Sequence, residues 1–130
     1  MRIENLVINC TARYPRTCRR TPFEVVVYEL NYSSEDKDLM DLLRTKAEEL
    51  ARQVNPGAAN NSMHERSPER ILADCIAGVV SEYFWKLYLN SEENVVSETE
   101  FDDASRQIDL KVISNNKKIE VRSSFPRNGI

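Results

Sequence analysis

Apolar and polar residues alternate along two segments near the C-terminal end of the sequence, and this alternation predicts a β-hairpin. Ile108, Leu110 and Val112 share one face of the first strand, and Ile119 and Val121 share the matching face of the second. A short polar segment joins the two strands. The opposite face gathers acidic and basic side chains, which form either cross-strand ion pairs or a site for a metal ion and a phosphate.

Two longer segments have apolar residues at helical spacing. The first helix is expected to begin at Ser33 or Ser34, with a charged face opposite its apolar stripe. The second is expected to run from an N-cap at Ser67 to about Asn90. This second segment is apolar almost all round, so we expect most of its sides to be buried, with Gly78 allowing another element to approach closely.

The remaining apolar segments are predicted to be strands. The five expected strands occupy residues 1–8, 23–32, 94–101, 107–113 and 117–124. A chain of 130 residues is long enough for one domain with a modest core. We therefore expect a single α/β (α+β) domain over residues 1–130, with a small mixed β-sheet flanked by helices.

The length of the polar turn sets how the last two strands pair. A two-residue turn would place Asp109 opposite Arg122. The same register would place Lys111 opposite Glu120. Asp109 and Glu120 would then be diagonal neighbours about 7 Å apart, a separation that suits two carboxylates reaching one divalent cation. In the simpler interpretation the facing charges are ion pairs, each worth about 0.2–1 kcal/mol.

The order of charged residues in this region resembles the restriction-endonuclease-like nuclease superfamily, whose signature is PD-(D/E)xK. Asp109 corresponds to the aspartate of that signature. Glu120 and Arg122 correspond to its second element, with arginine in the place of lysine. Glu82, on the preceding helix, corresponds to a glutamate that the family usually carries there.

The resemblance covers about residues 67–125 and implies a restriction-endonuclease-like core. The N-terminal strand and helix, residues 1–55, would pack on this core. Only eight residues follow Arg122, whereas the family core continues with a further helix and strand. We therefore expect a fragment, a shortened member, or a sheet completed by another segment or subunit.

The resemblance implies metal-dependent hydrolysis of phosphodiester bonds, in DNA more than in RNA, by a protein that works as a homodimer. Asp109, Glu120 and Glu82 would bind Mg2+, or Mn2+ in its place. Arg122 would hold the phosphate, but an arginine does not exchange protons near neutral pH. Lys111, on the same face, is the candidate to replace the family lysine.

Two other functions are consistent with the same residues. The replacement of lysine by Arg122 favours a catalytically inactive nuclease-fold module that binds nucleic acid or a protein partner. The apolar second helix, or an open sheet edge, would also suit a pure assembly module.

For Glu82, the alternative to ion binding is an i,i+4 pair with Lys86, worth about 0.2–0.5 kcal/mol.

Composition narrows the class of protein further. The net charge of −3 exerts no global attraction on nucleic acid, so binding would need a local basic patch. The candidates for such a patch are the arginines of the N-terminal loop, and the alternative is that they belong to an ordinary solvated loop: Arg13, Arg16, Arg19 and Arg20. The cysteines lack C-x-x-C spacing, which favours reduced thiols over a zinc site. No apolar run reaches the roughly 20 residues that span a bilayer, so we expect a cytoplasmic protein without a membrane partner.

Overall fold

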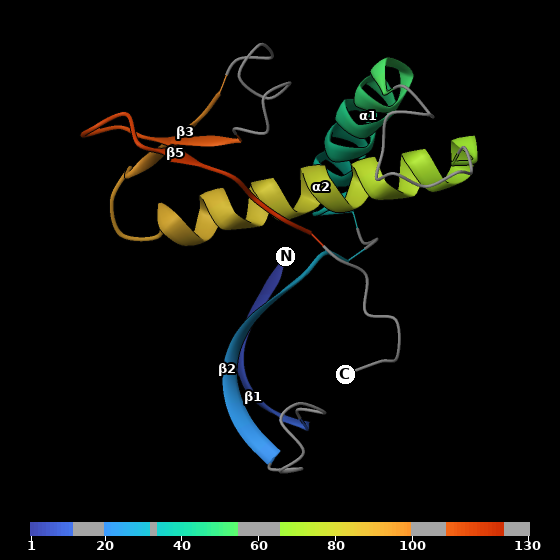
Figure 1. Ribbon diagram of the computed structural model, residues 1–130. Coiled ribbons are helices and arrows are strands. Elements are labelled where there is room, and N and C mark those ends of the chain that lie inside the picture. Colours follow the sequence, from blue (N-terminus) through green and yellow to red (C-terminus); the bar gives the residue numbers. More distant parts are fainter. Residues whose placement is uncertain (12–19, 32–33, 55–65, 100–108, 124–130) are drawn as a thin grey trace. The chain divides into compact units, whose positions relative to one another are not determined.

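The computed structural model describes residues 1–11, 20–31, 34–54, 66–99 and 109–123. The chain contains both helices and strands, in the order β1, β2, α1, α2, β3, β4, β5 (Figure 1). It divides into two compact units, one containing Met1–Met40 and the other Asp41–Phe125. Each unit is described by itself.

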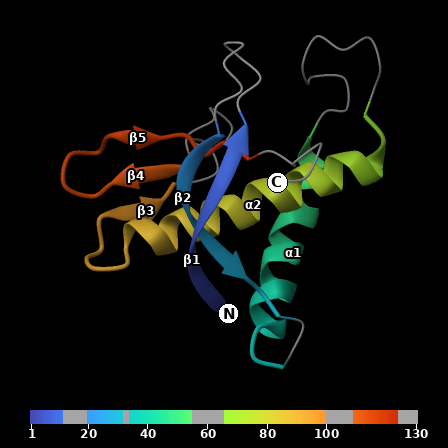
Figure 2. The ribbon, with the colours of Figure 1, turned by 90° about the horizontal axis from the view of Figure 1, so that it is seen from below.

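The first unit contains an antiparallel hairpin of β1 (Arg2–Thr11) and β2 (Arg20–Glu29), visible as the blue arrows in Figure 2. The ladder is regular and pairs Arg2 with Glu29 at one end and Thr11 with Arg20 at the other. Apolar side chains are exposed on both faces of the hairpin: Ile3, Val7 and Val26 on one, and Leu6, Phe23 and Val27 on the other. An isolated two-stranded sheet is at best marginally stable in water.

The open ends of the hairpin meet at a buried carboxylate. Asp36 is only 5% exposed. One of its oxygens accepts a hydrogen bond from the α-amino group of Met1 at 2.7 Å, and the other accepts one from the Asn31 backbone N–H at 2.8 Å. Asp36 thereby ties the residue before β1 to the segment that follows β2.

Helix α1 (Lys37–Gln53) begins later than the sequence suggests. The backbone carbonyl of Asp36 accepts the first helical hydrogen bond, from the Met40 N–H at 2.9 Å. The predicted start at Ser33 or Ser34 is therefore wrong. Further along α1, Leu43 and Ala47 are buried and contribute to the core of the second unit.

Helix α2 (Pro68–Leu89) confirms its predicted start and extent. The Ser67 hydroxyl accepts a hydrogen bond from the Arg70 backbone N–H at 3.2 Å, which satisfies one of the free donors of the first turn. The close approach expected at Gly78 is not found among the described residues, because a Cβ atom built there would meet none of their atoms within 4 Å. Ile71, Cys75 and Val79 supply the buried side of this helix.

Three short strands follow α2: β3 (Val96–Glu98), β4 (Leu110–Val112) and β5 (Lys118–Ile119). They form a sheet in the order β3-β4-β5, and every pairing in both described sheets is antiparallel, so the expected mixed sheet is not found. The Asn90 side chain connects the end of α2 to β3, because its Oδ1 accepts from the Val95 and Val96 N–H groups. The side chains of Val96 and Leu110 are buried on the inner face of this sheet.

The register of the C-terminal hairpin differs by two residues from the predicted one. Leu110 pairs with Ile119 and Lys111 with Lys118, so the same register brings Asp109 opposite Glu120. The reason is a longer turn, in which the Asn116 N–H donates to the Val112 carbonyl at 2.8 Å. Asn116 has φ of 55°, a left-handed conformation that asparagine tolerates better than most residues. A shift of two preserves the apolar face and changes the charged partners.

Candidate functional site

A cavity of about 260 Å3 lies in the second unit, between α1, α2 and the first two strands of the β3–β5 sheet. Its lining residues are Lys46, Glu49, Leu50, Gln53, Val79, Glu82, Glu98, Thr99 and Asp109. Four of these side chains are carboxylates and one is an ammonium group. The cavity is therefore strongly acidic, and it contains two of the predicted site residues, Glu82 and Asp109.

Glu82 reaches the cavity from the middle of α2. Burial raises the pKa of its carboxyl above the ordinary value, and the negative charges of Asp109 and Glu98 raise it further. The ammonium groups of Lys46 and Lys86 oppose this shift. Within the described ranges no hydrogen bond or ion pair holds the Glu82 carboxylate, so the predicted pair with Lys86 is not formed.

Asp109 immediately precedes β4 and is held in place by its own backbone and side chain. Its N–H donates to the Ile119 carbonyl at 3.0 Å, and its carbonyl accepts from the Thr99 N–H at 3.3 Å. The side-chain Oδ2 accepts a short hydrogen bond of 2.6 Å from the Val121 N–H. The segments on both sides thus fix the position of Asp109, and no hydrogen bond from another described residue occupies its Oδ1.

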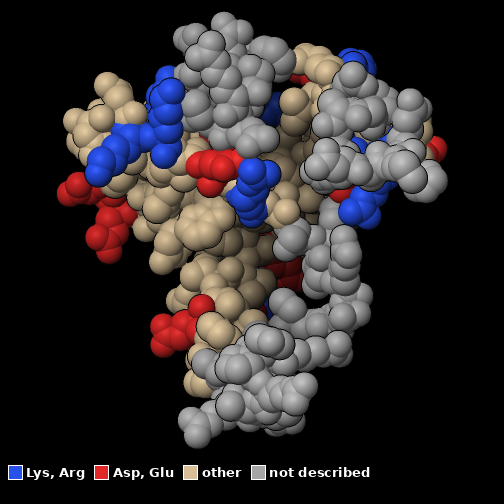
Figure 3. Space-filling model, in the orientation of Figure 1, with Lys and Arg blue, Asp and Glu red and all other residues tan. Residues whose placement is uncertain are grey.

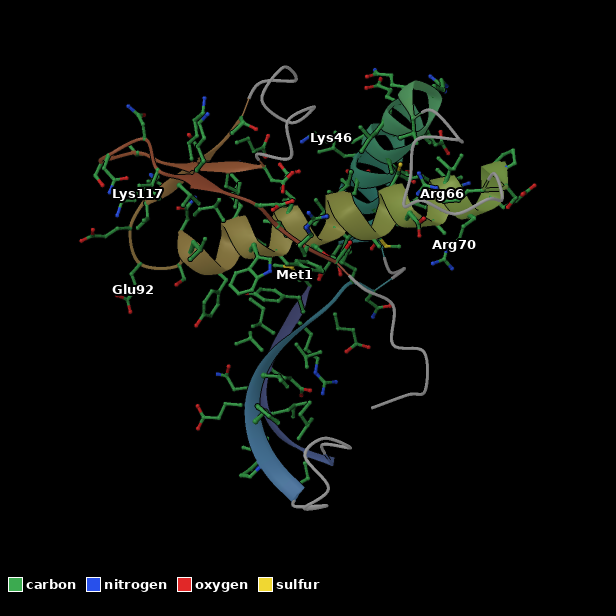
Figure 4. All side chains as sticks on the ribbon, in the orientation of Figure 1. Met1, Lys46, Arg66, Arg70, Glu92 and Lys117 are labelled. Atoms are coloured by element: carbon green, nitrogen blue, oxygen red, sulfur yellow. The ribbon has the colours of Figure 1, made fainter. Side chains whose placement is uncertain are left out.

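Glu98, at the end of β3, is a cavity carboxylate that the sequence interpretation did not include. Its two oxygens form ion pairs with Lys86 of α2 at 2.9 Å and with Lys46 of α1 at 3.4 Å. The hydrogen bond from Lys86 and the charges of both lysines lower the pKa of the Glu98 carboxyl, although its partial burial acts in the opposite direction. Figure 4 shows Lys46 extending from α1 toward the side on which the sheet lies.

The other predicted site residues lie outside the cavity lining. Glu120 forms an ion pair with Arg122 at 2.5 Å, and both side chains are exposed. The predicted facing pairs of Asp109 with Arg122 and of Lys111 with Glu120 are therefore wrong, because Lys111 pairs with Lys118 across the ladder. The structure brings Glu82 and Asp109 to one cavity, and it does not bring Glu120, Arg122 or Lys111 there.

The donor atoms of the cavity suit a hard cation. Among the residues whose placement is described, no three Asp, Glu, His or Cys side chains are close enough together to hold a metal ion. Mg2+, however, commonly uses only one or two protein carboxylates and completes its shell with water and substrate phosphate. Glu82 and Asp109 would be such a pair; the pKa of Glu82 is raised first by burial and then by the charges of Asp109 and Glu98, and a bound cation would offset those charges.

The predicted nucleic-acid contacts fall mostly outside the described residues. Arg13, Arg16 and Arg19 lie in the segment between β1 and β2 that is not described, and only the backbone of Arg20 is described, at the start of β2. On the face of the second unit seen in Figure 3, basic side chains are interspersed with acidic ones.

None of the helices in the described ranges is long and apolar enough to cross a bilayer. Cys75 is a free, buried thiol.

Sequence reasoning missed Lys46 and Glu98 for a clear reason. Both belong to segments that the resemblance leaves out or treats only as framework, and the two residues are 52 positions apart. The only available signal was that Lys46 sits one residue before the apolar position Ala47, at the edge of the buried stripe of α1.

No family model matches this chain, and no significant match exists among the curated proteins or among the solved structures.

Proposed function

We propose that this chain is a metal-dependent nuclease of the restriction-endonuclease-like type, with the acidic cavity of the second unit as its catalytic site. The observation that carries the proposal is the meeting of Glu82 and Asp109 at one cavity, from a helix and from the start of a strand. The order of a helix bearing glutamate and then three antiparallel strands also agrees with the order that the resemblance implies.

The charge of the cavity supports a role for a cation. Four carboxylates line it against one lysine, so a polyanion such as DNA would be repelled unless positive charge were added. Glu82 and Asp109 would hold the ion. A bound Mg2+ would offset charge on the phosphate and make a bound water more acidic.

The residues around the cavity would position the reacting groups. Hydrolysis joins a water oxygen to phosphorus and breaks one P–O ester bond, and the departing oxygen takes up a proton that ultimately comes from the water. Asp109 is suited to hold its part of the site rigidly, because strand backbone on both sides fixes it. Glu120 would have to break its ion pair with Arg122 to reach the same ion, so we assign ion binding first to Glu82 and Asp109.

The test combines ion binding with cleavage. Mn2+ binding is measured by calorimetry, and plasmid DNA and single-stranded RNA are incubated with Mg2+ or Mn2+. We expect Glu82→Gln and Asp109→Asn each to weaken ion binding by at least about 10- to 100-fold, because loss of even an outer-shell partner of a metal site has an effect of that size. Both should also abolish cleavage. Glu93→Gln, which removes an exposed carboxylate beyond the end of α2, is the matched control and should behave as the wild type.

Two results would contradict the nuclease proposal. One is a wild-type protein that neither binds Mn2+ nor cleaves either polymer. The other is cleavage that survives both Glu82→Gln and Asp109→Asn. Binding of nucleic acid with a steep salt dependence but without cleavage would instead favour the inactive binding module, a function with which the ion pair of Arg122 and Glu120 also agrees.

A further inference from the structure

Lys46 is the one basic residue among the described residues that line the cavity. It belongs to α1, outside the segment that resembles the nuclease family. Its ammonium nitrogen lies 3.4 Å from Glu98 Oε2, and half of its side chain is exposed. Lys46 lines the same cavity as Glu82 and Asp109, and its positive charge opposes the raised pKa of Glu82.

Glu98 does not need Lys46 for its own neutralisation. Lys86 forms the shorter contact with Glu98, at 2.9 Å, and Lys46 forms the longer one, at 3.4 Å. If Lys46 turned toward a ligand in the cavity, Glu98 would keep an ion-pair partner. Releasing Lys46 from Glu98 therefore costs little free energy, because the side chains of both residues are substantially exposed to solvent.

The two basic residues suggested by sequence are less well placed. Neither Arg122 nor Lys111 lines the cavity, and Arg122 forms its ion pair with Glu120 outside it. Both also have further contacts in the structure. A phosphate that reached Glu82 and Asp109 through a shared cation would therefore meet Lys46 before it met either of them.

We propose that Lys46 is the phosphate-binding ammonium group of this site, in the role that the resemblance gives to residue 122. The inference rests on the proposed nuclease function. The Lys46 ammonium would donate hydrogen bonds to a non-bridging oxygen of the scissile phosphate and offset the charge that develops on it. Its flexible stem allows the amine to move between Glu98 and the phosphate, and no proton needs to leave the lysine.

The experiment compares two lysines that share one partner. Lys46→Gln removes the cavity ammonium, whereas Lys86→Gln removes the other partner of Glu98 and leaves the cavity lining intact. We expect Lys46→Gln to slow DNA cleavage by about 10²–10³-fold, as loss of one charge-stabilising donor does in other enzymes. Lys86→Gln should slow cleavage much less than Lys46→Gln, because it removes no group from the cavity lining and only leaves Lys46 as the single partner of Glu98.

A binding measurement separates a phosphate contact from a structural role. The affinity of a short DNA duplex is measured with Ca2+ over a series of salt concentrations. Lys46→Gln should reduce the slope of log K against log salt by about one, and Lys46→Arg, which keeps the charge, should restore it. Lys86→Gln should leave the slope unchanged.

The outcomes distinguish this inference from the proposed function. If Lys46→Gln cleaves at the wild-type rate with an unchanged salt slope, while Glu82→Gln is inactive, Lys46 is not the phosphate ligand and the nuclease proposal stands. Equal losses in Lys46→Gln and Lys86→Gln would assign both lysines to holding Glu98, and would overturn the inference too. A wild type that neither cleaves nor binds the duplex would overturn both proposals.

Discussion

The first unit exposes the apolar side chains of a hairpin, whereas the second unit buries part of its apolar side chains in a core. Among the described residues of the second unit, seven apolar side chains are buried: Leu43, Ala47, Ile71, Cys75, Val79, Val96 and Leu110. Among the described residues of the first unit, the only buried side chain is the carboxylate of Asp36. The difference shows that regular backbone pairing and a hydrophobic core are separate sources of stability.

The contrast has a physical basis in the elements themselves. Helix α2 packs against β3 and buries Ile71, Cys75 and Val79, whereas Ile76, Trp85 and Tyr88 remain exposed, so the expected burial of most of its sides is not found. A two-stranded ladder satisfies its inner backbone groups but leaves both faces to solvent unless another element covers them. The first unit therefore relies on its ladder and on the hydrogen bonds to Asp36, and the second relies on packing.

The largest expected difference in the free energy of unfolding is between two variants, each of which truncates one apolar side chain in one unit. Leu110 is fully buried, so Leu110→Ala should lower the free energy of unfolding by about 2–5 kcal/mol. Val7 is 65% exposed, and Val7→Ala should change it by less than about 0.5 kcal/mol. Urea denaturation followed by circular dichroism measures both. Similar losses in the two variants would mean that the hairpin is buried in solution and would remove the contrast.

A smaller effect should come from the glycine in α2. A methyl group at residue 78 would enter open space, so Gly78→Ala should stabilise the second unit by about 1 kcal/mol through helix propensity. The same urea titration measures it. A loss of stability would show that another element approaches this position closely in solution, as the sequence interpretation had it.

The first unit should respond to acid through Asp36. The hydrogen bond from the Met1 amino group, together with that from the Asn31 N–H, lowers the pKa of the Asp36 carboxyl below its ordinary value of 3.8. The stability that this group contributes is therefore present above pH 3.8 and is lost as the pH falls through the lowered pKa. We expect Asp36→Asn to speed hydrogen exchange of the β1 and β2 amides at neutral pH. Glu35→Gln, at an exposed neighbour, should leave these exchange rates unchanged.

The smallest and most specific effect should come from two carboxylates in the cavity of the second unit. The pKa of Glu82 is raised above its ordinary value of 4.5, so the stability it contributes is present below pH 4.5 and is lost as the pH rises through the raised pKa. The pKa of Glu98 is lowered, so its contribution is present above pH 4.5 and is lost as the pH falls through the lowered pKa.

Neutral substitutions should therefore act in opposite directions at pH 7. Glu82→Gln should raise the thermal unfolding temperature, because it removes a carboxylate that is unfavourable when charged. Glu98→Gln should lower that temperature, because it removes the partner of Lys46 and Lys86. Scanning calorimetry between pH 4 and pH 8 tests both signs. If the two variants shift in the same direction, the cavity does not have the charge distribution described here.

The sequence was most informative where a structure depends on neighbours along the chain. The start of α2 at Ser67 and Pro68 follows from a hydroxyl that reaches a backbone N–H three residues away. The alternation of Leu110, Val112 and Ile119 correctly predicted which face of the hairpin is apolar. Its register was missed because the turn is longer than two residues and uses a left-handed Asn116, a choice that the strand pattern does not reveal.

The candidate site was foreseen only in part. Glu82 and Asp109 were named from their order along the chain, and they line the same cavity. Glu120 and Arg122 were named on the same grounds, but they pair with each other outside it. A shift of two residues in a hairpin leaves the inward face unchanged, yet it exchanges every charged partner on the outward face.

Periodicity and capping are local, since they depend on contacts within about one helical turn or one pleat, and this is why the amino-acid order alone predicts the helices and the polarity of each face. The composition of the acidic cavity depends instead on how separate elements pack. Lys46 and Glu98, 52 positions apart in the sequence, meet because buried side chains of α1, α2 and β3 bring their backbones together. No pattern within one segment encodes that meeting, because the energy that creates it belongs to the packed core.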